Sequence, residues 1–206
     1  MDPRPQGMAP SRRHAERGVT LIELMMVIVI IGIFTTMAAP TIVSTLQDRH
    51  AARGADEVQM LFRRARTRAS SYGAAHIVRV MSSGSNLRFE LRMAVNATSG
   101  FAVSNCLAST WTATGPENLL VDTVDFDAGP TYAGKQIVAT SLTGVGDYCY
   151  TPGGTPWWRI SGVWSRPASG LFLQFVVNRQ NDLGVPFGIT RTVTIGATGV
   201  PQMRVE

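Results

Sequence analysis

The clearest feature of the hydropathy pattern is an uncharged run of 24 residues, from position 24 to position 47. Its centre, LMMVIVIIGIFTTMAA, shows neither a polar face nor an amphipathic period. A membrane-spanning helix needs about 20 apolar residues, and a helix surrounded by lipid is apolar on all sides. The pattern therefore predicts one transmembrane helix within residues 19–47.

The residues in and around this run predict its orientation in the membrane and whether it is cleaved off or retained. Residues 1–18 are polar and hold four arginines against two acidic residues. Positive charge before an apolar segment keeps that end in the cytoplasm, so we expect the rest of the chain to be translocated across the membrane. An ordinary secretory signal peptide has a shorter apolar core and a small-residue cleavage site. Here the run is longer, Pro40 crowds any cut near Ala38, and a carboxylate, Glu23, lies inside the hydrophobic segment. We therefore expect the segment to be retained as an anchor.

After Pro40 the pattern becomes that of an amphipathic helix. Apolar residues recur at helical spacing, at Val58, Leu61, Phe62, Ala65 and Ala69. Residues 70–73 end the pattern with a glycine, which suits a helix C-terminus. We expect one helix from about residue 19 to residue 72, kinked near Pro40 because proline removes a backbone hydrogen bond. Its second half would pack on a soluble domain.

The rest of the chain alternates between polar and apolar residues, as strands do. The alternation predicts strands at 75–82, 86–94, 119–126, 136–141, 158–163, 171–178, 189–195 and 200–205. Residues 83–85 predict a hairpin between the first two strands, and 108–116 and 144–156 read as loops. The predicted fold class is therefore α+β, with a long N-terminal helix packed on antiparallel β-sheets. The domain outside the membrane would be residues 48–206, made of the amphipathic helix to about residue 72 and then the sheets.

The segment RGVTLIE at residues 17–23 resembles the type III signal of type IV prepilins and type II secretion pseudopilins. The resemblance implies that a prepilin peptidase cuts between Gly18 and Val19, that Val19 is then N-methylated, and that residues 1–18 are a leader. Glu23 would be the fifth residue of the mature chain. Gly32 and Pro40 also fall where many pilins carry glycine and proline. We expect a pilin-like fold.

Two further stretches resemble the GspH/FimT group of these families. Residues 62–69 with Gly73 and 77–80 form one, and residues 191–195 with Gly199 and Arg204 form the other. The family usually ends with a second arginine that this chain lacks. The resemblance implies a minor pilin or pseudopilin, assembled from the inner membrane into a periplasmic filament of a type II secretion or type IV pilus system. Its partners would be other pilins, the prepilin peptidase and the inner-membrane assembly platform.

The position of Glu23 suggests a role in this assembly. A carboxylate in low dielectric is costly unless it is paired. We expect Glu23 to pair with the α-amine that cleavage creates at Val19, on its own chain or on a neighbour. Such pairing would drive assembly and set the register.

The charge distribution raises an alternative, a minor pilin that binds DNA for uptake, as some FimT-like proteins are thought to do. The formal charge is +5, and residues 48–92 hold nine arginines against four acidic residues. Arg63, Arg64, Arg66 and Arg68 could contact phosphates. They could equally be solvated, or paired with acidic residues at 48, 56 and 57. We favour the structural reading, and nucleic acid is not an expected partner.

The sequence predicts neither a metal site nor a catalytic site. His50 and His76 are 26 residues apart and have no Cys or carboxylate at ligand spacing. Asp122, Asp125 and Asp127 lack the glycine-punctuated loop of a calcium site. There is no nucleophile elbow, phosphate loop or Cys/His pair for nucleophilic catalysis. We expect no enzymatic activity, no metal and no cofactor.

The two cysteines and the tryptophans of the later half complete the picture. Cys106 and Cys149 are predicted to form a disulfide, because pairing persists in the oxidising periplasm. The alternative is two buried free thiols. Trp157 and Trp158 must face opposite sides if they lie in a strand. One of them would then make a subunit contact or pack under a neighbouring Gly/Pro loop.

Overall fold

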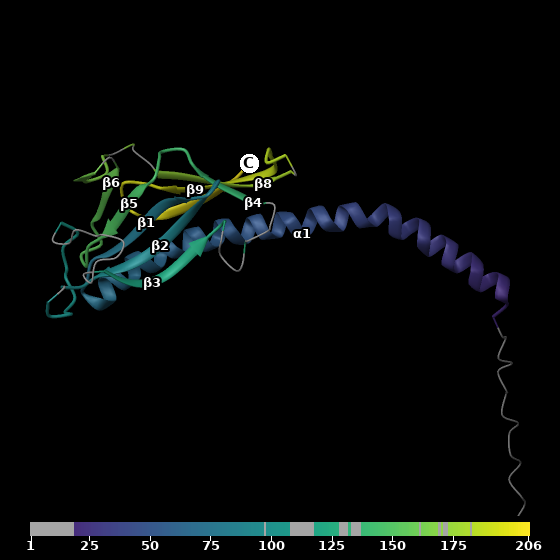
Figure 1. Cartoon of the computed structure of the whole chain (residues 1–206), viewed down its shortest axis with the longest axis horizontal. Helices are drawn as coiled ribbons and strands as arrows, with labels where there is room; N and C mark the ends of the chain where they lie inside the picture. The colour runs from purple at the N-terminus through teal and green to yellow at the C-terminus, as the bar shows by residue number, and fades with distance from the viewer. Residues whose placement is uncertain are drawn as a thin grey trace, which may run out of the picture. The chain divides into compact units, whose positions relative to one another are not determined.

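A computed structural model of the chain describes residues 19–96, 98–107, 118–127, 132, 137–160, 162–168, 170, 173–181 and 183–206. These residues form one helix, α1 (Leu21–Tyr72), and ten β-strands, labelled in Figure 1. The chain divides into two compact units, one ending at Ile42 and the other running from Val43 to Glu206. Residues of α1 belong to both units.

The strands of the second unit form two sheets in which all neighbours are antiparallel. The six-stranded sheet has the order β3 (Asn118–Asp125), β2 (Asn86–Ala94), β1 (His76–Ser83), β5 (Gly146–Tyr150), β6 (Pro156–Ile160) and β7 (Val163–Ser165). The four-stranded sheet has the order β10 (Pro201–Val205), β9 (Pro186–Ile195), β8 (Leu173–Gln180) and β4 (Ile137–Ser141). The two sheets meet where the Ala139 amide of β4 donates to the Asn86 side chain of β2, at 2.9 Å.

Within the second unit, α1 is an amphipathic helix. Its buried residues recur three or four positions apart, which places them on one face: Ala51, Ala55, Val58, Leu61, Phe62, Ala65 and Ala69. The helix ends at Tyr72 because Gly73 follows it with a φ of 62°, the left-handed conformation that terminates helices. Pro40 lies within α1, and the kink there stays a prediction.

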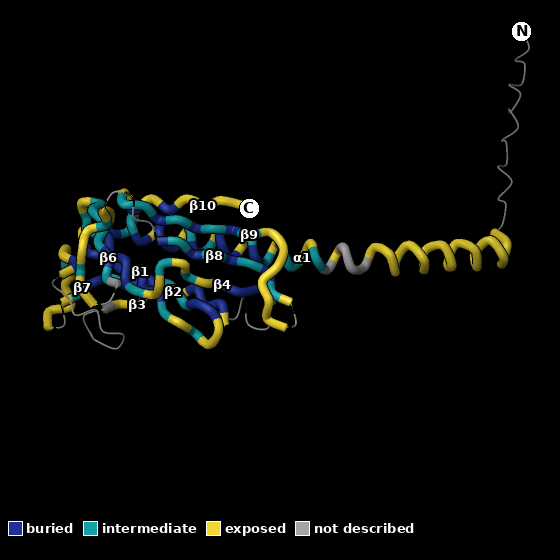
Figure 2. The backbone as a smooth tube through the Cα atoms, turned by 90° about the horizontal axis from the view of Figure 1, so that it is seen from above, coloured by how far each residue is buried: buried dark blue, intermediate teal, exposed yellow. Residues whose placement is uncertain are grey.

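This face of α1 and the inner faces of both sheets share one core, whose buried positions are dark blue in Figure 2. Phe62 of the helix lies 5.8 Å from the ring of Tyr148 in the first sheet and 5.8 Å from Phe175 in the second. The hydroxyl of Tyr150 donates to the Gly199 carbonyl at 2.6 Å. The aromatic core therefore joins the helix to both sheets.

The α+β prediction is confirmed, and so is the end of the helix, but two strand predictions were wrong. Residues 144–156 do not form a loop: they contain β5, a central strand between β1 and β6. The segment 158–163 is not one strand but parts of two, β6 and β7, which turn at Gly162 with a φ of 88°. Both errors arise because strands of three to five residues carry too few alternations to stand out. Positions 136, 161, 171 and 172 of the predicted strands lie outside the described residues, and so does the predicted loop at 108–116.

Candidate functional site

The candidate site begins at the first turn of α1, where Thr20 caps the helix. The Glu23 amide donates to the Thr20 hydroxyl at 3.3 Å, and the Leu24 amide donates to the Thr20 carbonyl at 3.2 Å. Thr20 and Glu23 have the spacing of a capping box, in which the acidic side chain can reach back toward the cap residue. A carboxylate in the first turn also interacts favourably with the helix dipole. The cap therefore fixes where the Glu23 side chain starts, one turn from Val19.

Sequence reasoning did not single out Thr20, although the signal was present. The pattern Thr-x-x-Glu directly before an apolar run marks a helix N-terminus, and residues 20–23 carry it. Val19 is exposed and lies just ahead of the helix. Gly18, on the other side of the predicted cleavage bond, lies outside the described residues.

The helix beyond this cap presents apolar side chains on all sides. From Leu21 to Ala38 it is long and apolar enough to cross a membrane, and none of this stretch is buried inside the first unit. Two threonines within it donate their hydroxyls to backbone carbonyls of the preceding turn, Thr35 to Ile31 at 2.7 Å and Thr36 to Ile33 at 2.8 Å. Because these hydroxyls are satisfied within the helix, they do not prevent an apolar environment.

The four arginines weighed as nucleic-acid contacts do not gather on one face. At 100° per residue, positions 63, 64, 66 and 68 spread over about 200° of the helix surface. The Arg64 guanidinium pairs with Asp122 of β3 at 2.6 Å, and Arg68 lies over the ring of Tyr72 at 5.8 Å. Arg63 is exposed and Arg66 is half-buried. The structure therefore brings these side chains to different neighbours.

The face of the six-stranded sheet opposite α1 carries a group of buried ion pairs. Asp147 of β5 accepts from Arg79 of β1 at 2.8 Å and from Arg159 of β6 at 2.9 Å. On β2, Glu90 pairs with Arg88 and Arg92, each at 2.7 Å. No local sequence pattern indicates the group around Asp147, because its members lie 12 and 68 residues apart along the chain.

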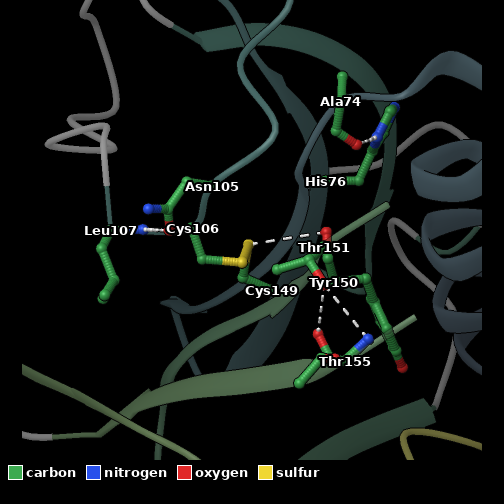
Figure 3. Close-up of a disulfide and its surroundings, with 9 residues drawn as sticks. All are labelled: Ala74, His76, Asn105, Cys106, Leu107, Cys149, Tyr150, Thr151 and Thr155. Atoms are coloured by element: carbon green, nitrogen blue, oxygen red, sulfur yellow. Dashed lines mark hydrogen bonds between the residues drawn. A yellow bond between two sulfur atoms is a disulfide. The ribbon is translucent and has the colours of Figure 1, made fainter. Parts of the chain in front are cut away.

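The predicted disulfide between Cys106 and Cys149 is present, with a Cα–Cα distance of 6.0 Å (Figure 3). Both cysteines are fully buried in a second apolar cluster. Cys149 lies on β5 opposite Ile77 of β1 and Trp157 of β6. The bond therefore ties the segment that follows β2 to the centre of the sheet, on the face opposite α1.

The adjacent tryptophans face opposite sides of β6, as expected. Trp158 packs in the main core, and its indole nitrogen donates to Ser165 at 2.7 Å. Trp157 packs against the disulfide cluster, with the Arg166 guanidinium 5.1 Å from its ring. Both rings thus find partners within the chain. Trp111 lies outside the described residues.

The histidines and aspartates weighed as metal ligands have other surroundings. His76 is buried beside the Ala74 carbonyl, which lies 3.0 Å from Nδ1 (Figure 3). Burial lowers the pKa of His76 below its ordinary value of 6.5. Asp122 pairs with Arg64, and Asp125 accepts from Ser83 at 3.3 Å. Among the described residues, no group of three His, Cys, Asp or Glu side chains is placed to hold a metal ion.

Comparison with known proteins points to the first turn of α1. Residues 13–39 match the family described as the prokaryotic N-terminal methylation motif. No curated protein matches the chain. Two crystal forms of the type IV minor pilin FimU from Pseudomonas aeruginosa are similar in structure, each at 15% identity. The first covers 77% of this chain and 90% of FimU at a TM-score of 0.43, and the second covers 75% and 91% at 0.39. The prokaryotic N-terminal methylation motif therefore lies at the head of a long helix whose second part packs on two antiparallel sheets.

Proposed function

We propose that the chain is a minor pilin or pseudopilin of the GspH/FimT type, which is assembled from the inner membrane into a periplasmic filament. The observation that carries the proposal is the methylation motif at residues 13–39, which spans Gly18, Val19 and Glu23. The helix that follows it exposes apolar side chains on all sides. The filament would belong to a type II secretion system or to a type IV pilus.

Processing comes first in this function. A prepilin peptidase cuts the bond between Gly18 and Val19 on the cytoplasmic face, and the new α-amine of Val19 is methylated. Because the cut lies before the apolar run, the mature chain keeps its anchor in the inner membrane. The rest of the chain, from about residue 48, lies in the periplasm.

The assembly step uses the first turn of α1. The α-amine at Val19 and the carboxylate of Glu23 lie about one helical turn apart. Thr20 caps the helix between them and keeps the first turn formed. In the low dielectric of the membrane, the carboxylate is stabilised by pairing with an amine, on its own chain or on a neighbour. Pairing with a neighbour's amine favours assembly, because the carboxylate then has its partner only while the two subunits are in contact.

The test removes the carboxylate in two variants, of which Glu23→Gln keeps the size of the side chain. Glu23→Gln and Glu23→Ala should insert into the inner membrane at the level of the unaltered chain but should fail to cross-link to other pilin subunits. Thr20→Ser, which keeps the cap hydroxyl, is the matched control and should incorporate normally. If Glu23→Ala enters the filament as well as the unaltered chain does, the proposed role of the carboxylate is wrong.

The alternative of a DNA receptor makes a different prediction. The protein in detergent should retard DNA in a gel at low salt, and changing Arg63, Arg64, Arg66 and Arg68 together should abolish the shift. We favour filament assembly, because the four guanidinium groups lie on different sides of the helix and one is engaged by Asp122.

A further inference from the structure

The turn between β8 and β9 carries an unusual set of exposed apolar side chains. Leu183, at the tip, is 87% exposed, more than any other large hydrophobic side chain among the described residues. Val185, Phe187 and Ile189 follow it at alternate positions and are exposed as well. We refer to Leu183, Val185, Phe187 and Ile189 as the apolar tip. Figure 2 shows the start of β9 coloured as exposed.

Hydrogen bonds within the turn hold the backbone of the apolar tip. The Asn181 side-chain oxygen accepts from the amides of Leu183 and Val185, at 3.0 and 2.8 Å. The Asn181 amide donates to the Val185 carbonyl at 3.0 Å, and the Gly184 amide donates to the Asn181 carbonyl at 2.9 Å. These hydrogen bonds hold the backbone of the turn in the conformation that exposes the Leu183 side chain. The exposure of Leu183 is therefore a property of the fold.

The base of the hairpin is fixed to the first part of α1 that belongs to the second unit. The guanidinium of Arg179 is buried and donates to the Ser44 carbonyl at 3.3 Å, to Asp48 at 3.1 Å and to Gln47 at 2.9 Å. It also lies 4.4 Å from the ring centre of Phe187. These contacts hold the apolar tip close to residues 44–48.

Chain connectivity limits how far the base of this hairpin can lie from the end of the apolar run. Ala38 closes the stretch that is long enough to span a membrane, and Ser44 follows it by six residues. Six residues reach at most about 22 Å when extended and about 9 Å as a helix. The headgroup layer on each side of a bilayer is about 5–8 Å thick. Because α1 continues without a break through residues 38–44, the hairpin base is bound to a residue that follows the apolar run by about 9 Å of helix.

We propose that the apolar tip inserts into the headgroup region of the phospholipid bilayer from the periplasmic side. The proposal rests on the membrane anchoring proposed above. Aliphatic and aromatic side chains bind at this boundary by burying apolar area. Residues 181–190 include one charged residue, Asp182, which lies outside the described residues. We take lipid as the occupant because the base of the hairpin is bound to Ser44, which follows the proposed anchor by six residues.

This contact gives the subunit a second attachment to the membrane before assembly. The anchor holds the chain in the bilayer, and the tip restrains the second unit at the surface. Extraction into a filament would have to release both.

The test places an environment-sensitive fluorophore on a new cysteine in the full chain. Both natural cysteines are bonded, so an added thiol is the one that reacts. Leu183→Cys reports on the tip, and Val185→Cys is the second reporter should the first disturb the turn. Leu142→Cys is the matched control: it is 64% exposed and lies beside Gln174, at the other end of β8 from Arg179. Ile30→Cys, within the apolar run, reports on the anchor.

The labelled chains are reconstituted into vesicles of phosphatidylethanolamine and phosphatidylglycerol that contain a quencher-bearing lipid. We expect a blue-shifted label at position 183, quenched at least about twofold more strongly than the label at 142. If positions 183 and 185 match 142 while position 30 is quenched, the inference is overturned and the anchoring stands. If position 30 is not quenched either, the anchoring itself is wrong. Protection of position 183 only after other pilin subunits are added would show that the tip binds protein instead of lipid.

Discussion

The buried carboxylate of Asp147 gives the sharpest test of how the second unit is held together. Its side chain is 9% exposed and accepts hydrogen bonds from Arg79, also 9% exposed, and from Arg159. Asp147→Asn keeps the shape of the side chain but removes its charge. Two guanidinium groups, of which that of Arg79 is 9% exposed, would then lie close together without the carboxylate charge between them. Removing one partner of a buried pair costs about 3–5 kcal/mol.

The matched control is Asp122→Asn, which removes a carboxylate from a surface pair. The Arg64 and Asp122 side chains are 56% and 35% exposed, so water screens this pair and its loss should cost about 1 kcal/mol or less. A urea titration of each variant in detergent, with the disulfide intact, measures the difference. For a slope of about 2 kcal/mol per molar urea, Asp147→Asn should lower the midpoint by about 2 M and Asp122→Asn by less than about 0.5 M.

The reasoning depends on burial, and the comparison can refute it. If Asp147→Asn lowers the urea midpoint no more than Asp122→Asn does, the buried pairs do not contribute as argued. A changed slope in one variant would indicate an altered denatured or native state, and the midpoints alone would then not be comparable. Adding Arg159→Gln to Asp147→Asn should recover part of the loss, because it removes one of the two positive charges that repel each other there.

Three further predictions concern single features of the second unit. Replacing both Cys106 and Cys149 by alanine opens a loop with a sequence separation of 43 and should lower the free energy of unfolding by about 4 kcal/mol, measured by urea titration; an unchanged midpoint would show that the bond does not constrain the unfolded chain. Gly199→Ala should destabilise more than Gly73→Ala in thermal melts: both have positive φ, but a Cβ at Gly199 would lie 2.7 Å from the Tyr150 ring and one at Gly73 meets nothing. Because burial lowers the pKa of His76 below 6.5, its contribution to stability is complete above about pH 6.5 and is lost as the pH falls below it. Unfolding midpoints between about pH 5 and 8 should therefore slope less in His76→Gln than in the unaltered chain, and equal slopes would contradict the assignment.

The sequence predicted the local features well, because their signals lie within one turn or one strand. The uncharged run, the amphipathic stripe around Phe62 and the stop at Gly73 are all repeated patterns over short distances. The strand β2 was predicted with its bounds, because alternation over nine residues is unambiguous. Thr20 was overlooked although its capping pattern with Glu23 is equally local.

The features that escaped prediction depend on residues that are distant in sequence. Asp147 meets Arg79 only because β5 inserts beside β1, and β5 itself is too short to be recognised by alternation. The contact of Arg179 with Asp48 joins residues 131 positions apart. No local pattern indicates such pairs, since they follow from the order of strands in the sheet. The pairing of Cys106 with Cys149 was predicted from the oxidising compartment expected for both, in a chain that holds two cysteines.

The central claim is that the chain is processed as a prepilin, and the mass of its mature N-terminus tests this most directly. The full chain is expressed with an active prepilin peptidase, and the membrane fraction is analysed by mass spectrometry. We predict a chain that begins at Val19 with one methyl group on its α-amine and keeps the apolar run. Gly18→Val should remain uncut. A chain cut near Ala38, or a chain that keeps its leader beside an active peptidase, would contradict the account.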